Sequence, residues 1–374
     1  MKLGDICEVV TGSTPKTGVS EYWDGDIKWI TPAELTDETF IVTDSVRKIT
    51  ESAVKRTGLS TIPKGAVILS SRAPIGKVAI AGCDLYCNQG FKNFICSKAI
   101  LNEYLYWFLK GKKEYLNSLG RGATFKEISK DIVQNIEIEV PDIKRQREIA
   151  MILKKCNNII TKWKKEINEL NKLVQARFVE MFGKCKNMVP IEDLCLIITD
   201  GTHQPPKFQE KGIPFIFVSN LTDNKITYEA EKFISDETYA ELIMRTPIEK
   251  GDILLSTVGS YGHPAVVTED RRFLFQRHIA YLKPKHELIN SFYLHGALLA
   301  PDSQRQIDER VKGIAQKTLN LSEIRKIIIP VPNLEQQKCY EDFAHQVDKS
   351  KVAIQKSLDE MQLLFDSLMQ EYFG

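Results

Sequence analysis

The sequence lacks the long apolar runs that would place it in a membrane. No stretch of about 18 uncharged apolar residues, the length that a spanning helix needs, occurs in its 374 residues. The first ten residues also lack an apolar core followed by a small-residue cleavage site. We therefore expect no membrane span and no signal peptide, and we expect a cytoplasmic protein.

Closely paired cysteines are missing as well. The eight cysteines are scattered, and Cys83, Cys87 and Cys96 have neither tight pairing nor a nearby histidine. A zinc site is disfavoured because structural zinc sites use closely spaced pairs of ligands. Cys7 and Cys195 lie in apolar patterns, as does Cys156, and we interpret them as small buried hydrophobes in a reducing compartment.

Catalytic motifs are absent too. The dipeptide 111–112, Gly-Lys, lacks the upstream glycine of a nucleotide-binding loop. Residues 205–208, Pro-Pro-Lys-Phe, lack the Asn or Asp that precedes the prolines in the Asn/Asp-Pro-Pro-aromatic motif of adenine methyltransferases. Glu137 and Glu139 alternate on a predicted strand without the further groups that a nuclease gathers around a metal. We predict no catalytic, cofactor-binding or metal-binding residue in this chain.

The charge balance is close to neutral. The chain has 51 Lys and Arg residues against 49 Asp and Glu residues, so the total does not indicate a nucleic-acid partner. A DNA-binding face would have to come from local clustering of charge. Six histidines are unremarkable in a chain of this length, and a surface or hydrogen-bonding role is favoured over a catalytic one for them.

The most informative feature of the sequence is an internal repeat. Residues 3–11 align with residues 191–199, so that Asp5 matches Asp193 and Cys7 matches Cys195. Later matches follow in the same order: 27–30 with 213–216, 35–37 with 221–223, 63–70 with 249–256, Gly76 with Gly262, 136–141 with 327–332, and 180–183 with 371–374. The series predicts two copies of one domain with its tail, at about 1–183 and 184–374.

Each copy begins with a β-rich part. Short apolar, largely β-branched runs bounded by Gly and Pro predict strands at 67–70, 78–80, 253–256 and 265–267. A helical patch follows in each copy, at 102–119 and 289–310, and then one more strand, at 136–140 and 327–331. The copies are therefore expected to be mixed α and β domains.

After the final strand of each copy, the pattern predicts a helix of about forty residues. Its apolar residues recur at alternating spacings of three and four. The predicted seam consists of Leu153, Ile160, Trp163, Ile167 and Leu170 in the first helix, and of Val347, Ile354, Leu358, Met361, Phe365 and Leu368 in the second. A narrow stripe favours pairing of the two helices, with packing of each stripe on its own domain as the alternative. At 1.5 Å per residue such a helix is roughly 60 Å long, so an antiparallel pair would hold two domains apart.

The sequence resembles the specificity subunits of Type I restriction-modification systems over essentially its whole length. The resemblance is carried in the first copy by residues 11–15 and 22–32, and in the second copy by residues 200–203. Residues 331–337, Val-Pro-Asn-Leu-Glu-Gln-Gln, are similar to the Pro-Leu-Glu-Glu-Gln signature that opens a conserved helix of that family. The corresponding residues 141–146 of the first copy lack the paired acids of the signature.

The resemblance implies an α+β fold with two target-recognition domains, 1–143 and 184–333, and two long antiparallel coiled-coil helices, 144–183 and 334–374. It implies that each domain reads one half of an asymmetric, split site on double-stranded DNA. It implies that the helices set the spacer and dock two DNA adenine methyltransferase subunits, with restriction and motor subunits joining for cleavage. S-adenosylmethionine and ATP are then expected only in those partners. The alternatives are an enzyme, which the missing motifs disfavour, and a scaffold that binds proteins alone.

Three matched pairs of polar loops are the candidate DNA contacts. They are 71–77 with 259–263, 88–92 with 276–278, and 120–126 with 312–317. The side chains that we single out, for phosphates or base edges, are Arg72, Lys77, Gln89, Lys92, Arg121 and Lys126 in the first copy, and His203, Ser260, Tyr261, His263, Arg277, His278, Lys312, Gln316 and Lys317 in the second. Each could instead belong to an ordinary solvated loop. The copies differ at most of these positions while agreeing in the strands, as expected if each reads a different half-site.

Overall fold

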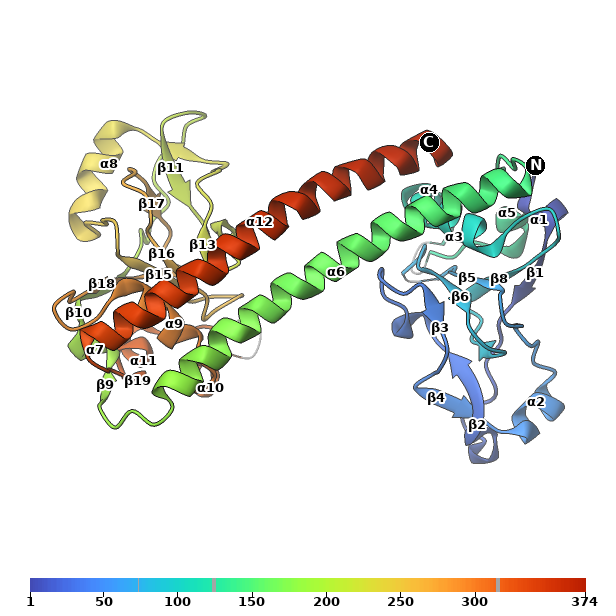
Figure 1. Cartoon of the computed structure of the whole chain (residues 1–374), viewed down its shortest axis with the longest axis horizontal. Coiled ribbons are helices and arrows are strands. Elements are labelled where there is room, and N and C mark those ends of the chain that lie inside the picture. Colours follow the sequence, from blue (N-terminus) through green and yellow to red (C-terminus); the bar gives the residue numbers. More distant parts are fainter. Residues whose placement is uncertain (73, 123–125, 314–316) are drawn as a thin grey trace. The chain divides into compact units, whose positions relative to one another are not determined.

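A computed structural model of the chain describes residues 1–72, 74–122, 126–313 and 317–374. It contains two compact units, which we call the first unit (Met1–Lys165 with Gln355–Gly374) and the second unit (Glu166–Ile354). Two long helices, α6 (Ile143–Phe182) and α12 (Leu334–Phe373), each contribute one part to each unit (Figure 1). The predicted helices are confirmed, whereas the exact domain boundaries stay a prediction.

The first unit is built on a larger and a smaller sheet. The larger sheet has the order β1-β8-β5-β6-β3, with β1 (Cys7–Thr11), β3 (Ile41–Val42), β5 (Val67–Ser70), β6 (Val78–Ala81) and β8 (Phe91–Cys96). The smaller sheet has the order β4-β2-β7, with β2 (Trp23–Ile30), β4 (Arg47–Ile49) and β7 (Tyr86–Cys87). β5 and β6 are buried at every position, which explains why they read as continuous apolar runs.

The remaining elements of the first unit are short helices. They are α1 (Leu3–Ile6), α2 (Glu51–Thr57), α3 (Asn102–Gly111), α4 (Lys113–Leu119), α5 (Lys130–Gln134), and the 3-10 turns η1 (Ser20–Tyr22) and η2 (Pro32–Glu34). α3 packs on β5 and β6 and closes the core of the larger sheet. The smaller sheet has an aromatic core, in which Trp23 and Trp29 pack edge to face at 5.1 Å with the Arg47 guanidinium 3.8 Å above the Trp23 ring.

The second unit repeats this plan. Its larger sheet has the order β10-β18-β15-β16, with β10 (Cys195–Asp200), β15 (Ile253–Ser256), β16 (Pro264–Val266) and β18 (Ile279–Pro284). Its smaller sheet has the order β14-β11-β17, with β11 (Ile213–Ile216), β14 (Phe233–Ile234) and β17 (Leu274–Phe275). Two short ladders pair β12 (Leu221–Thr222) with β13 (Lys225–Ile226), and β9 (Met188–Pro190) with β19 (Ile328–Pro330).

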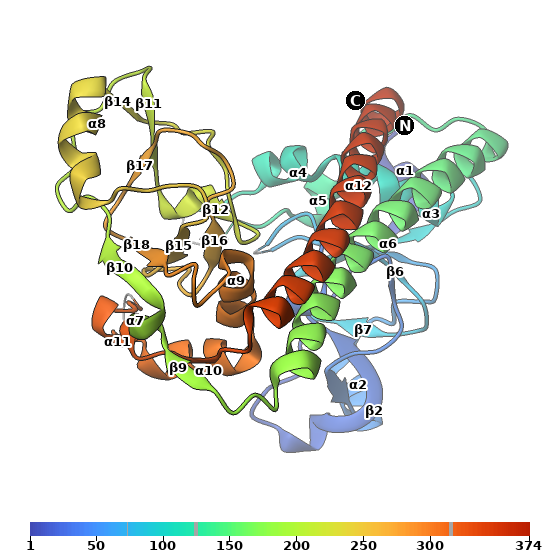
Figure 2. The same ribbon diagram turned by 60° about the vertical axis from the view of Figure 1, so that its left-hand side comes forward.

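The helices of the second unit correspond to those of the first. They are α7 (Ile191–Leu194), α8 (Asp236–Leu242), α9 (Ser291–Leu299), α10 (Pro301–Arg310), α11 (Leu321–Arg325), and the 3-10 turns η3 (Val218–Asn220) and η4 (Ile243–Arg245). Both views show α8 beside the smaller sheet, with α9 beside the larger one (Figures 1 and 2). Each unit therefore consists of two lobes, and the predicted α+β repeat is confirmed.

A buried glutamine ties each long helix to its own unit in the same way. The Gln146 side chain donates to the Pro141 carbonyl at 2.8 Å and accepts from the Leu101 N–H at 2.8 Å. The Gln337 side chain donates to the Pro332 carbonyl at 2.9 Å and accepts from the backbone N–H of residue 290 at 2.8 Å. Both glutamines are fully buried, so these bonds fix where each helix leaves its domain.

The two long helices are antiparallel. Near the beginning of α6, the Arg145 guanidinium lies 5.6 Å from the Tyr372 ring at the end of α12, within the first unit. At the end of α6, Phe182 lies 5.9 Å from Tyr340 near the beginning of α12, within the second unit. The residues of the predicted seam are all buried or half-buried: Leu153, Ile160, Trp163, Ile167, Leu170, Val347, Ile354, Leu358, Met361, Phe365 and Leu368.

The helix ends also pack into the domain cores, so the alternative interpretation of the stripe holds for part of it. Phe365 of α12, a residue of the predicted seam, lies 5.8 Å from Trp107 of α3 in the first unit. Beyond the seam, Phe373 of α12 lies 5.2 Å from Tyr104 of α3, and its counterpart Phe182 lies 5.0 Å from Tyr293 of α9 in the second unit. Part of the apolar stripe therefore anchors its helix to a domain, and pairing of the two helices through the rest of it stays a prediction.

Three predicted elements are wrong in detail. Each helical patch is two helices, because the chain turns at Lys112 in the first copy and at Ala300 in the second, where the following proline disfavours a helical residue. The strand predicted at 136–140 pairs only through a single bridge between Lys2 and Glu137. Within the described ranges, no helix has the length and apolarity to cross a membrane.

Candidate nucleic-acid interface

The three predicted loops of the first unit meet where β5 ends and β8 begins. The Ser71 N–H donates to the Gly90 carbonyl at 2.8 Å, which joins the first loop to the second. The Ile128 N–H donates to the Ser71 carbonyl at 2.9 Å, which joins the first loop to the chain after the third. We call this meeting point the loop junction of the first unit. Loops that are separate in the sequence therefore form one continuous surface.

A carboxylate organises the cations of this junction. Glu127 lies 3.6 Å from the Arg72 guanidinium and 3.3 Å from the Lys92 ammonium. Lys92 also donates to the Ser71 hydroxyl at 3.2 Å, and its side chain is only 4% exposed. The side chain of Arg72 is 43% exposed. Arg72 is therefore open to solvent, whereas Lys92 lies inside the junction, and contact of either side chain with DNA stays a prediction.

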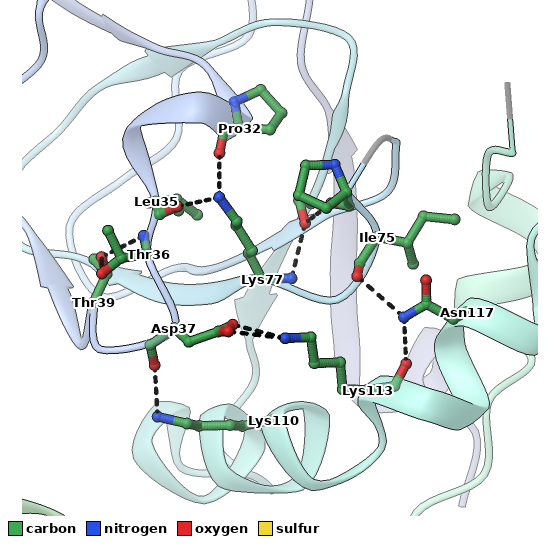
Figure 3. Close-up of polar contacts among 12 residues, drawn as sticks. Pro32, Leu35, Thr36, Asp37, Thr39, Ile75, Lys77, Lys110, Lys113 and Asn117 are labelled. Carbon is green, nitrogen blue, oxygen red and sulfur yellow. Dashed lines mark hydrogen bonds and ion pairs between the residues drawn. The ribbon is translucent and has the colours of Figure 1, made fainter. Parts of the chain in front are cut away.

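Lys77 faces the protein. Its ammonium donates to the Pro32 carbonyl at 3.3 Å and also to the Leu35 carbonyl (Figure 3). Beside it, the Lys113 ammonium lies 2.8 Å from the Asp37 carboxylate and holds the pKa of that carboxyl below its ordinary value. These contacts attach the chain around 32–37 to the larger sheet and to α4. They make Lys77 a positioning residue in this structure, and its contact with DNA stays a prediction.

The segment 11–15, which carries part of the family resemblance, lies against the second loop. The Ser13 N–H donates to the Cys87 carbonyl at 2.8 Å, and the Thr14 hydroxyl hydrogen-bonds to Gln89. A Cβ atom on Gly12 would collide with the carbonyl of residue 88, so only glycine permits this approach. The other predicted donors of this unit, Arg121 and Lys126, are exposed on the third loop.

The second unit has the same junction. The Thr257 N–H donates to the His278 carbonyl at 3.0 Å, and the Leu319 N–H donates to the Thr257 carbonyl at 2.8 Å. The segment 200–203 lies against the second loop, since the Arg277 N–H donates to the carbonyl of residue 202 at 3.1 Å. Gly201 repeats the role of Gly12, because a Cβ atom there would collide with the carbonyl of residue 275. The junction is therefore a property of the repeat.

A cleft of about 490 Å³ opens beside the junction of the second unit. It is lined by Asp200, Thr257, Val258, Arg277, His278, Thr318, Leu319, Asn320, Leu321 and Ser322. The Asp200 carboxylate at its edge bonds the His203 imidazole at 2.8 Å and the Arg245 guanidinium at 2.8 Å. Burial, with a smaller contribution from the charge of Arg277, lowers the pKa of His278. The lining presents hydroxyl and amide groups, the exposed guanidinium of Arg277 and the carboxylate of Asp200, which is paired with Arg245, so the cleft suits a polar ligand.

The remaining predicted residues of the second unit surround this surface. The Tyr261 hydroxyl donates to Asp308 at 2.9 Å, and the Lys317 ammonium lies 5.8 Å from the Tyr261 ring. His263 lies with its Nδ1 atom 3.3 Å from the side-chain oxygen of Asn224. Ser260 and Lys312 are exposed, and Gln316 lies outside the described residues.

Two members of the interface were not found from the sequence. Glu127, which holds Arg72 and Lys92 in the first unit, stands just beyond the third loop. Arg245, which pairs with Asp200, comes from η4 and is far from Asp200 in the sequence. No local motif marks either residue. Across the part of the chain that the structure describes, no cluster of three or more His, Cys, Asp or Glu side chains could hold a metal ion.

Comparison with known proteins agrees with this architecture. The family model of the Type I restriction modification DNA specificity domain matches residues 1–172 and again residues 185–361. The chain belongs to this family. The two matches correspond to the two copies of the repeat, and specificity subunits are non-catalytic, so the prediction that the chain is not an enzyme is confirmed by its membership.

Relatives and solved structures support the assignment over most of the chain. The MjaIX specificity subunit of Methanocaldococcus jannaschii is 32% identical over 357 residues, covering 88% of this chain and 82% of the relative. The MjaVIII specificity subunit of the same organism is 22% identical over 381 residues, covering 93% and 85%. The crystal structure of the S subunit from M. genitalium shares the fold, with a TM-score of 0.61, 14% identity, and coverage of 100% of this chain and 95% of that one.

Proposed function

We propose that this specificity subunit recognises a bipartite, asymmetric site on double-stranded DNA, with one half-site read at each loop junction. The observation that carries the proposal is that the two junctions have the same backbone pairing but different side chains. An antiparallel β-bridge joins Arg72 to Glu127 in the first unit, and the equivalent bridge joins Val258 to Thr318 in the second. Because base edges are distinguished by the donors and acceptors presented to them, different side chains on one frame suit different base sequences.

The cations of the interface suit the phosphate backbone. Arg72, Arg121 and Lys126 surround the first junction, and Arg277, Lys312 and Lys317 surround the second. Local charge is also uneven elsewhere, since α6 carries 10 Lys and Arg against 4 Asp and Glu, whereas α12 carries 4 against 8. Local positive charge of this kind attracts a polyanion although the whole chain is nearly neutral.

The long helices have the surface that partner subunits would need. Apolar side chains remain exposed on α6 at Met151, Ile159, Leu173 and Val179, and on α12 at Val352, Leu363 and Leu364. Exposed apolar groups gathered on a helix indicate a protein partner. We propose that they dock two adenine methyltransferase subunits, with restriction and motor subunits joining this assembly. S-adenosylmethionine and ATP would be bound by those partners, and the length of the helices would set the spacer.

The test is a base-resolution methylome of cells that carry the chain with its methyltransferase partner. Deleting the chain should abolish a split adenine-methylated motif. Arg72→Ala should relax one half of that motif and Arg277→Ala the other half, by about 10- to 100-fold in base discrimination if each side chain bonds a base. Lys55→Ala, on α2 with a side chain that is 74% exposed, is the matched control and should change neither half.

Two outcomes would overturn the proposal. A methylome that is unchanged by deletion, with the methyltransferase shown to be active, would remove the specificity role. Duplex DNA binding that is absent, or that does not weaken as salt rises, would favour the alternative of a protein scaffold, because contacts to phosphates release counterions.

A further inference from the structure

Two thiols face each other in the larger sheet of the first unit. β1 and β8 are antiparallel, and their register places Cys7 directly opposite Cys96. Directly opposite residues project from the same face of a sheet, so both side chains lie beside the buried pair Val9 and Phe94. Cys7 is 5% exposed, whereas Cys96 is partly exposed at the end of its strand.

The hydrogen-bond pattern shows which kind of pair this is. The Ser97 N–H donates to the Ile6 carbonyl at 3.0 Å, and the Gly12 N–H donates to the Phe91 carbonyl at 3.4 Å. Hydrogen-bonded and non-hydrogen-bonded pairs alternate along an antiparallel ladder, so Cys7 and Cys96, one step from the 6–97 pair, form a non-hydrogen-bonded pair. Such a pair brings Cα atoms to about 4.5 Å, within the range of roughly 4.4–6.8 Å that a disulfide spans.

The thiols already interact. The neighbouring Cys96 thiol lowers the pKa of Cys7 against the opposing effect of burial. The same pairing raises the pKa of Cys96. The two thiols therefore lose their protons one after the other, as a coupled pair.

The second copy of the repeat lacks the partner thiol. Cys195 occupies the position of Cys7, but its opposite residue on β18 is Pro284. Burial raises the pKa of Cys195 to about 12, so its thiol is inert at neutral pH. The molecule thus contains an internal control, a cysteine in the same place on the same fold without a neighbour.

We propose that Cys7 and Cys96 form a redox-modification site, at which a small disulfide oxidant such as oxidised glutathione converts the two thiols to a reversible cross-strand disulfide. The pair loses one proton, and the resulting thiolate attacks one sulfur of oxidised glutathione, giving a mixed disulfide on the protein and releasing one reduced glutathione. The second thiol then loses its proton and attacks the protein sulfur of that mixed disulfide, releasing the second reduced glutathione. One oxidised glutathione is consumed, two reduced glutathiones form, and the protein loses two hydrogen atoms.

The disulfide would close a covalent loop that contains most of the loop junction of the first unit. The chain between Cys7 and Cys96 contains the smaller sheet and the first two loops of the junction. Closing so long a loop restricts the unfolded chain, so oxidation stabilises the first unit. The second unit has no equivalent cross-link. This inference concerns the chain's own thiols and is independent of the DNA that the protein reads.

The experiment uses the full chain, reduced and then equilibrated in buffers of oxidised and reduced glutathione. Free thiols are blocked with N-ethylmaleimide, and the protein is digested without reduction and analysed by mass spectrometry. We expect Cys7 and Cys96 to lose their reactivity together and to appear in one cross-linked peptide, while Cys195 stays reduced. The melting temperature of the oxidised protein should rise by a few degrees and return with dithiothreitol.

Cys96→Ala is the matched variant. It should remove the cross-link and the rise in melting temperature together, while Cys7 stays a free thiol. The cross-linked peptide and the melting temperature of the wild-type protein test the proposal even if this variant folds poorly. Two results would overturn it: glutathione attached to Cys96 while Cys7 remains free, or both thiols unreacted in a buffer that already modifies the exposed Cys339.

Discussion

Truncating Phe373 should unfold the first unit locally although the residue is at the far end of the chain. Its ring is 7% exposed and lies 5.2 Å from Tyr104 and 5.9 Å from Phe108, both on α3. The last part of α12 belongs to the first unit. Phe373→Ala removes a buried aromatic ring and leaves a cavity, which costs about 3–5 kcal/mol of free energy of unfolding.

Hydrogen exchange measured by mass spectrometry localises this loss. A cost of about 3 kcal/mol corresponds to roughly a hundredfold faster exchange through local opening, which we expect in α3 and not in α9 of the second unit. Leu363→Ala, on the same helix with a side chain that is 71% exposed, should change stability by less than about 0.5 kcal/mol. Phe182→Ala should give the mirror result in α9, because Phe182 packs there on Tyr293.

Either of two results would refute this reasoning. Equal acceleration of exchange in α3 and α9 would show that the units do not have separate cores. Unchanged exchange in α3 would show that the end of α12 is not part of the first unit.

Three further predictions follow from single side chains. Burial lowers the pKa of His295 to about 4, so its contribution to stability is complete above the unfolded pKa of about 6.5 and is lost as pH falls towards 4. Urea melts should show a loss of about 2 kcal/mol in the free energy of unfolding by pH 5. A His295→Gln variant with the same pH dependence would contradict this prediction. Arg245→Ala should lower the free energy of unfolding by less than about 1 kcal/mol, because its ion pair with Asp200 is partly exposed. It should nevertheless weaken binding of the second half-site, because it leaves an unpaired carboxylate beside the cleft. An unchanged DNA affinity in fluorescence anisotropy would exclude this role. Gln146→Leu should lower the free energy of unfolding by about 2–4 kcal/mol, because it leaves buried backbone groups without hydrogen-bond partners. Denaturant melts measure this change, and an unchanged free energy of unfolding would mean that water replaces the amide.

Local pattern was sufficient to predict the repeat, the long helices and the most apolar strands. Residues 67–70 read as a strand because they are apolar and β-branched, and β5 has those bounds. The stripe containing Leu153 and Leu358 read as a seam because its spacing matches the helical period, and both residues are buried. Periodicity is a property of neighbouring residues, so it survives without any knowledge of the fold.

The interface depended on more than pattern. The sequence indicated three polar loops in each copy, and it could rank their side chains only by type. Lys77 and Lys92 were chosen as donors in the same way as Arg72, but the fold directs Lys77 to backbone carbonyls and buries Lys92 beside Glu127. Which face of a loop a side chain takes is decided by residues elsewhere in the chain.

By itself, the sequence determined that the protein has two copies of an α+β domain joined to two long amphipathic helices, because an internal repeat and a helical period can be recognised from the order of residues alone. Only the tertiary structure decided that Ser71 joins the second loop to the chain after the third, that Arg245 meets Asp200, and that Cys7 faces Cys96. These contacts join segments far apart in the chain. Their geometry follows from how the sheets pair and how the core packs, and no spacing in the sequence encodes it.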